Sequence, residues 1–212
     1  ELCEGLGLKE YLAARAATPR VADDIRRAYD KTMEFCVKYG HFSIAPGNMD
    51  GGLTTIEEKS MGAMVKSGTR PIRGAPKKPG LYLLDTTPDE KLEPAHHEAA
   101  DPSDMLDLIA CGAHIVFLVT GRGHVVGTPV SPVIKVTGNP RTYGRMKDDI
   151  DFCAAPALTG DRSLDDLSDD LLELVSRVAQ GERTNAERLG HREGILYFNY
   201  QDPEKVPCEW HF

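Results

Sequence analysis

The stretch "DPSDMLDLIACGAHIVFLVT", residues 101–120, carries the clearest fold signal in the chain. Its first half has apolar residues at helical spacing and reaches Gly112, which predicts a short capped helix. Its second half, 114–120, is an apolar and β-branched run that predicts a buried strand. The earlier apolar run "LYLLD", 81–85, precedes the helix. Together the three segments predict a β-α-β crossover, and such units build parallel sheets.

Segments on both sides extend this pattern. Residues 133–140 predict a third strand, and 141–150 predict another short helix. Longer helices are expected at 9–17, at 20–39 with Thr18 as N-cap, at 54–66, and after Ser163 in "SLDDLSDDLLELVSRVAQGE". The stretch 69–80 is rich in proline and glycine, which predicts an irregular connection, and 194–203 predicts a late strand or an arm on a partner subunit.

These elements predict an α/β fold, a layered, Rossmann-like domain with a mostly parallel sheet and flanking helices. We expect 1–70 to be a helical segment with a glycine-rich loop and a capped helix. We expect 71–160 to be the α/β core with the site at the carboxyl ends of its strands. The remaining 161–212 would add a helix and tail to the same domain.

The composition limits the function classes. The 212 residues carry a formal net charge of -8, with 41% hydrophobic and 27% charged residues. This acidic balance argues against nucleic-acid or anionic-membrane partners, and no apolar run is long enough to span a bilayer. No signal-peptide pattern is present, so we expect a cytoplasmic protein. Five cysteines without C-x-x-C spacing argue against a disulfide framework and a zinc knuckle.

The stretch "PGNMDGGLTTIEEKSMG", 46–62, allows two interpretations. Thr54 with Glu57, or Thr55 with Glu58, forms a capping-box pattern, so the stretch fits a turn that feeds a helix. The glycines before it also let backbone amides approach an anion in front of the helix N-terminus. On this second interpretation, the stretch is a ligand-binding loop.

Polar residues follow the predicted strands at three places: Asp85–Thr87, Thr120–His124 and Thr137–Asn139. In a parallel sheet these places share one edge, which is the usual position of a ligand. Arg122 lies between two glycines and suits bidentate carboxylate binding, although a tight turn with a solvated arginine is the alternative. Lys135 lies inside a predicted strand, so it is either paired, catalytic, or an edge lysine that points to water.

The histidines differ in what their surroundings suggest. His41 follows the end of a predicted helix and precedes the glycine-rich loop, so it is a candidate for acid-base or metal chemistry, with a helix-dipole partner as the alternative. His96 and His97 lie among acidic residues without metal-ligand spacing, so a solvated loop is favoured.

Four motifs together resemble the altronate/galactarate dehydratase family of sugar-acid dehydratases: "PGNMDGGLTTIEEKSMG", "GLYLLDTT", "VTGRGHVVGTPVSPVIKVTGNPRT" and "DDIDF". The resemblance runs from about residue 40 to 155. The family pattern falls on Asn48, Gly51 and Gly52 of the glycine-rich loop, on Thr54, Thr55, Glu58 and Lys59 of the expected helix after it, and on Thr120, Arg122 and Lys135. The resemblance implies that this chain is the carboxyl-terminal part of a larger enzyme, which agrees with its start without methionine.

The resemblance further implies a divalent metal, Fe²⁺ or else Mn²⁺ or Mg²⁺, and removal of water from a sugar acid to give a 2-keto-3-deoxy acid. Such a reaction needs a base, a clamp for the carboxylate and an acid. We expect Lys59, Glu58 and His41 as catalytic residues, with Lys59 as the base. Glu58 and Asp85 are candidate metal ligands.

The remaining candidates, Asn48, Gly51, Gly52, Thr54, Thr55, Thr120, Arg122 and Lys135, are expected to bind the substrate. The expected partners are a small acidic molecule, the amino-terminal remainder of the enzyme and further copies of the chain. Two alternatives remain open: a sulfolactate sulfo-lyase that releases sulfite, and a substrate-binding fragment without turnover.

Overall fold

The computed structural model describes residues 8–39, 56–66, 68–86 and 101–193. The chain divides into two compact units, Glu1–Ala95 and His96–Phe212, and each is described by itself. No helix in the described ranges is long and apolar enough to cross a bilayer. The domain boundaries expected from the sequence stay a prediction.

The amino-terminal unit packs helices on a very small parallel sheet. Its elements are α1 (Leu8–Ala14), α2 (Pro19–Tyr39), α4 (Ile56–Lys66), β1 (Ile72–Arg73) and β2 (Leu81–Tyr82). Its buried core consists of Leu8, Leu12, Tyr29 and Ile72, so α1, α2 and β1 all contribute to it. The Thr18 hydroxyl accepts a hydrogen bond from the Val21 N–H at 3.4 Å, which supports the predicted start of α2.

The prediction for residues 69–80 was wrong in one respect. Within this stretch β1 pairs in parallel with β2, in the register Ile72 with Leu81. Ala16 also forms a parallel bridge with Ile72. A strand of two residues leaves no periodic pattern in the sequence, and tertiary pairing overrides the prolines around it.

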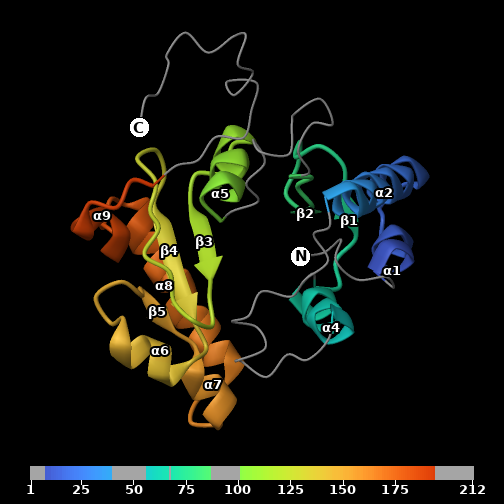
Figure 1. Ribbon diagram of the computed structural model, residues 1–212. Helices are drawn as coiled ribbons and strands as arrows, with labels where there is room; N and C mark the ends of the chain where they lie inside the picture. The colour runs from blue at the N-terminus through green and yellow to red at the C-terminus, as the bar shows by residue number, and fades with distance from the viewer. Residues whose placement is uncertain (1–7, 40–55, 67, 87–100, 194–212) are drawn as a thin grey trace, which may run out of the picture. The chain divides into compact units, whose positions relative to one another are not determined.

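The carboxyl-terminal unit is a three-stranded parallel sheet in the order β3-β4-β5 with helices around it (Figure 1). Its elements are α5 (Asp101–Ala110), β3 (Val116–Val119), β4 (Val133–Thr137), α6 (Pro140–Arg145), β5 (Phe152–Cys153), α7 (Ala155–Thr159), α8 (Leu164–Ala179) and α9 (Asn185–Leu189). The predicted helices at 101–111 and after Ser163 and the strand at 133–140 are confirmed. Together with the first unit, this arrangement is an α/β fold.

Strand β4 is the centre of this unit, because all five of its residues are buried. On one face Val133 packs with Val116 and with Met105 of α5. On the other face Ile134 and Val136 pack with Val178 of α8. Alternate side chains of a strand point to opposite faces, so β4 joins the two helical layers into one core.

The predicted crossover from 81–85 through 101–111 to 114–120 was wrong. Strand β2 pairs with β1 in the first unit, whereas β3 pairs with β4. In the second unit, parallel connections run from β3 to β4 and, through α6, from β4 to β5. Strand β3 is an edge strand, and its Val119 side chain is 69% exposed, so it is less buried than the apolar run suggested.

Candidate functional site

The carboxyl ends of β3 and β4 bring two of the three predicted polar clusters together. The Gly121 carbonyl after β3 accepts a hydrogen bond from the Thr142 hydroxyl at 2.7 Å and another from the Asn139 side-chain amide at 3.1 Å. We call residues 120–123 and 137–142 the strand-end cluster. The third predicted cluster begins with Asp85 and follows β2, so it belongs to the other unit.

A tight turn shapes the loop that carries Arg122. The Gly123 N–H donates to the Thr120 hydroxyl at 3.1 Å, and Gly123 has a φ of 93°. The positive φ favours glycine here, and a Cβ at this position would lie 2.1 Å from the Met146 sulfur, so a larger residue would also displace the Met146 side chain. The turn leaves Arg122 exposed at its tip, where a guanidinium can meet a carboxylate in a bidentate pair.

Asn139 connects the two halves of the strand-end cluster. It is the N-cap of α6, and its side-chain oxygen accepts hydrogen bonds from the N–H groups of Arg141 and Thr142. Its side-chain nitrogen donates to Gly121 as described above. One side chain therefore fixes both the start of α6 and the position of the glycine loop.

Lys135 lies inside the fold and not at a solvated edge. Its side chain is fully buried, and its Nζ donates to the Val125 carbonyl at 3.2 Å. Burial lowers the pKa of Lys135, although the carboxylates of Asp149, Asp151 and Glu193 act in the opposite direction. The interpretation of Lys135 as an edge lysine that points to water was therefore wrong, and its expected role in binding stays a prediction.

Asp151 is a structural residue that the sequence analysis did not identify. Its two carboxylate oxygens accept hydrogen bonds from the Lys135 and Asn185 N–H groups, each at 2.7 Å. Burial raises the pKa of Asp151, while these hydrogen bonds and the Lys135 charge oppose the rise. Asp151 thus ties β4 to the start of α9.

Glu193, His191 and Asp149 form a second polar group next to Gly127. Glu193 accepts a hydrogen bond from the Gly127 N–H at 3.0 Å, and its other oxygen lies 3.0 Å from His191 Nδ1. Asp149 lies 3.7 Å from the other ring nitrogen of His191. Gly127 and Asp149 lie more than 40 residues before the His191 and Glu193 side chains that they contact, so no local motif could have predicted the group.

The predicted catalytic residues fall in the amino-terminal unit or outside the described residues. Glu58 is exposed on the first turn of α4, and Lys59 follows it on that helix. Asp85 lies 3.8 Å from the Lys31 ammonium. His41, Asn48, Gly51, Gly52, Thr54 and Thr55 lie outside the described residues. The roles expected of these residues therefore stay predictions.

The described part of the chain shows no metal site. Its residues include no group of three or more His, Cys, Asp and Glu side chains that could hold an ion. Of the two candidate ligands, Asp85 faces Lys31 instead, which disfavours a cation at its carboxylate. The described residues alone do not fit a divalent metal.

Comparison with known proteins gives one family and several relatives. Residues 1–201 match the family described as D-galactarate/Altronate dehydratase, C-terminal. The chain is 33% identical to (2R)-sulfolactate sulfo-lyase subunit beta of Chromohalobacter salexigens, over 95% of this chain and 52% of the relative. It is 31% identical to altronate dehydratase of Escherichia coli, over 72% of this chain and 30% of the relative. It is 28% identical to altronate dehydratase of Bacillus subtilis, over 93% of this chain and 39% of the relative. The chain thus spans about half the length of these relatives, or less.

Proposed function

The chain belongs to the D-galactarate/altronate dehydratase family, in its C-terminal part, and we propose that it forms the corresponding part of a lyase that acts on a hydroxy acid. The relatives support this class because their names describe dehydratases and a sulfo-lyase. The structural observation that carries the proposal is the exposed Arg122 on a glycine turn, held by Asn139 and Thr142 through the Gly121 carbonyl.

We propose that Arg122 binds the carboxylate of the substrate. Its guanidinium offers paired N–H donors, and the hydrogen bonds at Gly121 hold the turn in a fixed position before the substrate arrives. The same charge would stabilise the enolate-like dianion that forms when the proton next to the carboxylate is removed. Lys135 would help to hold the loop in place, because its Nζ donates a hydrogen bond to the carbonyl of Val125, three residues after Arg122.

For a sugar acid, the elimination breaks one C–H bond and one C–O bond and releases water. The enol that forms then becomes the 2-keto-3-deoxy acid. We propose Lys59 as the base that takes the proton, and Glu58 and His41 as further catalytic residues that assist proton transfer to the leaving hydroxide. A divalent metal, Fe²⁺ or else Mn²⁺ or Mg²⁺, remains part of the proposal for the full-length protein, and metal analysis of that protein tests it.

A second candidate is elimination of sulfite from sulfolactate. It is favoured by the sulfo-lyase relative, which aligns over 95% of this chain at 33% identity. The same α-proton would be removed, but a C–S bond would break in place of the C–O bond. Arg122 would have the same role in both reactions, because both substrates carry a carboxylate next to the reacting carbon.

The full-length protein should be assayed with a panel of aldonic and aldaric acids and with (2R)-sulfolactate, measuring 2-keto acid and sulfite separately. The Arg122→Gln substitution should raise KM at least about tenfold, since a charged hydrogen bond contributes about 1.5–3 kcal/mol. Arg145→Gln, which removes an exposed cation from the last turn of α6, is the matched control. Turnover of none of these acids, with binding retained, would favour the non-catalytic alternative. An unchanged KM in Arg122→Gln would contradict its role.

A further inference from the structure

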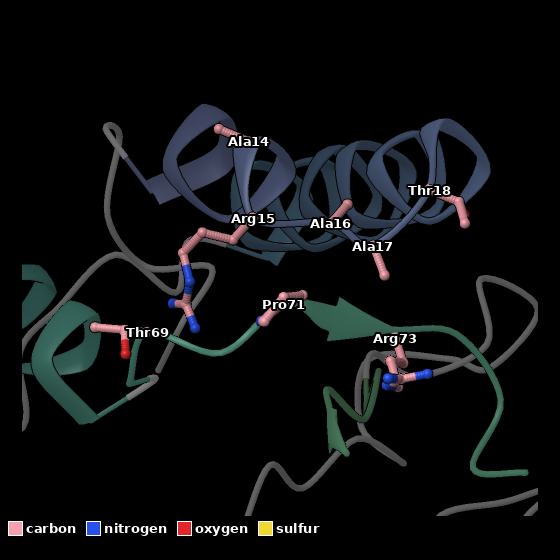
Figure 2. A pocket seen from close by; sticks show the side chains of 8 residues that line it. All are labelled: Ala14, Arg15, Ala16, Ala17, Thr18, Thr69, Pro71 and Arg73. Atoms are coloured by element: carbon pink, nitrogen blue, oxygen red, sulfur yellow. The ribbon is translucent and has the colours of Figure 1, made fainter. Parts of the chain in front are cut away.

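The amino-terminal unit contains a hollow of about 620 Å³ that the proposed function does not use. It lies between the residues that join α1 to α2 and the residues that lead into and form β1 (Figure 2). Its lining comes from 14–18 on one side and from Thr69, Pro71 and Arg73 on the other. None of these residues belongs to the strand-end cluster.

Backbone pairing explains why two arginines line the same hollow. The Ala17 N–H donates to the Ile72 carbonyl at 2.7 Å, and the Ile72 N–H donates to the Arg15 carbonyl at 2.8 Å. Residues 15–17 therefore run parallel to β1. The Ile72 side chain is only 1% exposed and faces the core, so Pro71 and Arg73 lie on the opposite, outer face. Figure 2 shows the Arg15 and Arg73 side chains on either side of Pro71.

Both guanidinium groups are positioned by the fold. Arg15 donates from Nη2 to the Arg70 carbonyl at 3.0 Å, and its guanidinium lies 5.5 Å from the centre of the Tyr11 ring. The Arg73 stem crosses Gly80 so closely that a Cβ there would lie 2.5 Å from Arg73 Cδ. Glycine at position 80 therefore leaves the space that the Arg73 side chain occupies.

The positive charge of the lining favours a negatively charged ligand. The described residues that line the hollow include two guanidinium groups and the hydroxyl-bearing Thr18 and Thr69, and none of these described residues is a carboxylate. The amino-terminal end of α2, a helix of 21 residues, begins directly after Thr18 and adds a partial positive charge. The hollow also lies beside parallel-paired backbone that feeds a helix, which is a common position for anions in α/β proteins.

We propose that this hollow binds the oxyanion group of a small acid, either a carboxylate or a phosphate. Arg15 and Arg73 supply charge-assisted hydrogen bonds, and Thr18 and Thr69 supply neutral ones. None of the described lining residues is one proposed for the lyase reaction, so this proposal stands without that one. It gives the amino-terminal unit a ligand of its own.

The test is a titration of the isotopically labelled chain with sodium phosphate and with sodium malonate, monitored by NMR at the Arg15 and Arg73 Nε–H groups and at the Ala17 N–H. Sodium chloride at matched ionic strength is the reference. We expect saturable shifts with at least one of the two acids and none with chloride. Tighter binding of malonate identifies a carboxylic acid as the ligand class, and tighter binding of phosphate identifies a phosphorylated one.

Variants locate the binding. Arg73→Met keeps the aliphatic stem but removes the charge, and it should weaken binding about tenfold or more. Gly80→Ala keeps the net charge but displaces the Arg73 stem, so it should also weaken binding. Arg27→Met is the matched control, because Arg27 lies on α2, is paired with Asp24 and does not line the hollow. Wild-type affinity in both Arg73→Met and Gly80→Ala, or equal shifts with chloride, would overturn the proposal.

Discussion

Both units have exposed ion pairs, but the carboxyl-terminal unit also holds a fully buried lysine and a hydrogen-bonded, half-buried aspartate. In the amino-terminal unit the ion pairs that join α1 to α2 lie at the surface, as in Lys9 with Asp30 at 2.6 Å and Arg26 with Glu10 at 2.9 Å. In the carboxyl-terminal unit Lys135 is fully buried and Asp151 bonds to backbone N–H groups of two elements. Water screens the exposed pairs, whereas Lys135 is shielded from water and Asp151 is partly shielded. Exposed charge pairs are therefore expected to contribute little to stability, and the carboxylate that bonds to two backbone N–H groups is expected to contribute more.

The cores offer the strongest test of this division. Ile134→Ala removes a fully buried side chain between β4 and α8 and should lower the free energy of unfolding by about 2–5 kcal/mol. Hydrogen exchange should show lost protection in β3 and β4, while α1 and α2 keep theirs. Ile72→Ala, at 1% exposure in the other core, is the matched variant and should give the reverse pattern. Equal loss in both units from either variant would show that the cores are not separate.

The next effect concerns the half-buried carboxylate of Asp151. Asp151→Ala leaves the Lys135 and Asn185 N–H groups without their acceptor, and each orphaned donor costs about 1–3 kcal/mol. Asp30→Ala removes a carboxylate whose side chain is 54% exposed, and it should cost about 0–1 kcal/mol. Urea unfolding of both variants at pH 7 measures the difference. Similar losses in the two variants would remove the distinction between surface and buried charge.

Much of the carboxyl-terminal unit was predictable because its signals are local. The helix at 101–111, the strand at 133–140 and the capped helix after Ser163 each carry their pattern within about 20 residues, and all three are present. The partner of each strand is not encoded locally. The run 81–85 pairs with β1, although the sequence placed it in one sheet with 114–120.

The candidate site also has a part that the sequence predicted and a part that it did not. Glycines on both sides of Arg122 marked the turn, and the predicted neighbourhood of 120–124 and 137–139 is present in the structure. Asp151 could not be identified, because one of its partners is Asn185, 34 residues later in the chain. Asp151 lies in the quoted motif "DDIDF", but nothing in that motif shows that its carboxylate bonds to distant backbone N–H groups.

A smaller effect is expected where the strand-end cluster meets the glycine turn. Thr142→Val keeps the shape of a buried residue but removes its hydrogen bond to the Gly121 carbonyl, which should cost about 1 kcal/mol. Backbone relaxation at Gly121 and Gly123 should show increased motion. Thr159→Val, whose hydroxyl bonds to Asp161 on an exposed turn, is the control and should leave the loop unchanged. An unaltered loop in Thr142→Val would show that Asn139 alone holds it.

The smallest effect compares two glutamates, one in each unit, at acid pH. The Arg26 hydrogen bond lowers the pKa of Glu10. Burial alone would raise the pKa of Glu193, but hydrogen bonds from its own N–H, the Gly127 N–H and the His191 side chain outweigh it and lower the pKa. A lowered folded-state pKa gives stability that is complete above the ordinary value of 4.5 and is lost as the pH falls through the folded-state pKa. Each glutamate therefore steepens the acid limb of the stability curve.

The stability contributions of the two glutamates should differ in how strongly they depend on salt. At about 1 M salt the screening length falls to about 3 Å, which weakens the exposed Glu10–Arg26 pair more than the bond from Glu193 to the Gly127 N–H. Urea unfolding between pH 3 and 7 should therefore show that Glu10→Gln differs from wild type only at low salt. Glu193→Gln should differ in stability from wild type at both salt concentrations, because the substitution removes the charge that accepts the hydrogen bond from the Gly127 N–H. If salt removes both differences equally, the Glu193 contribution is a surface effect, and the contrast between the units does not extend to residues 191–193.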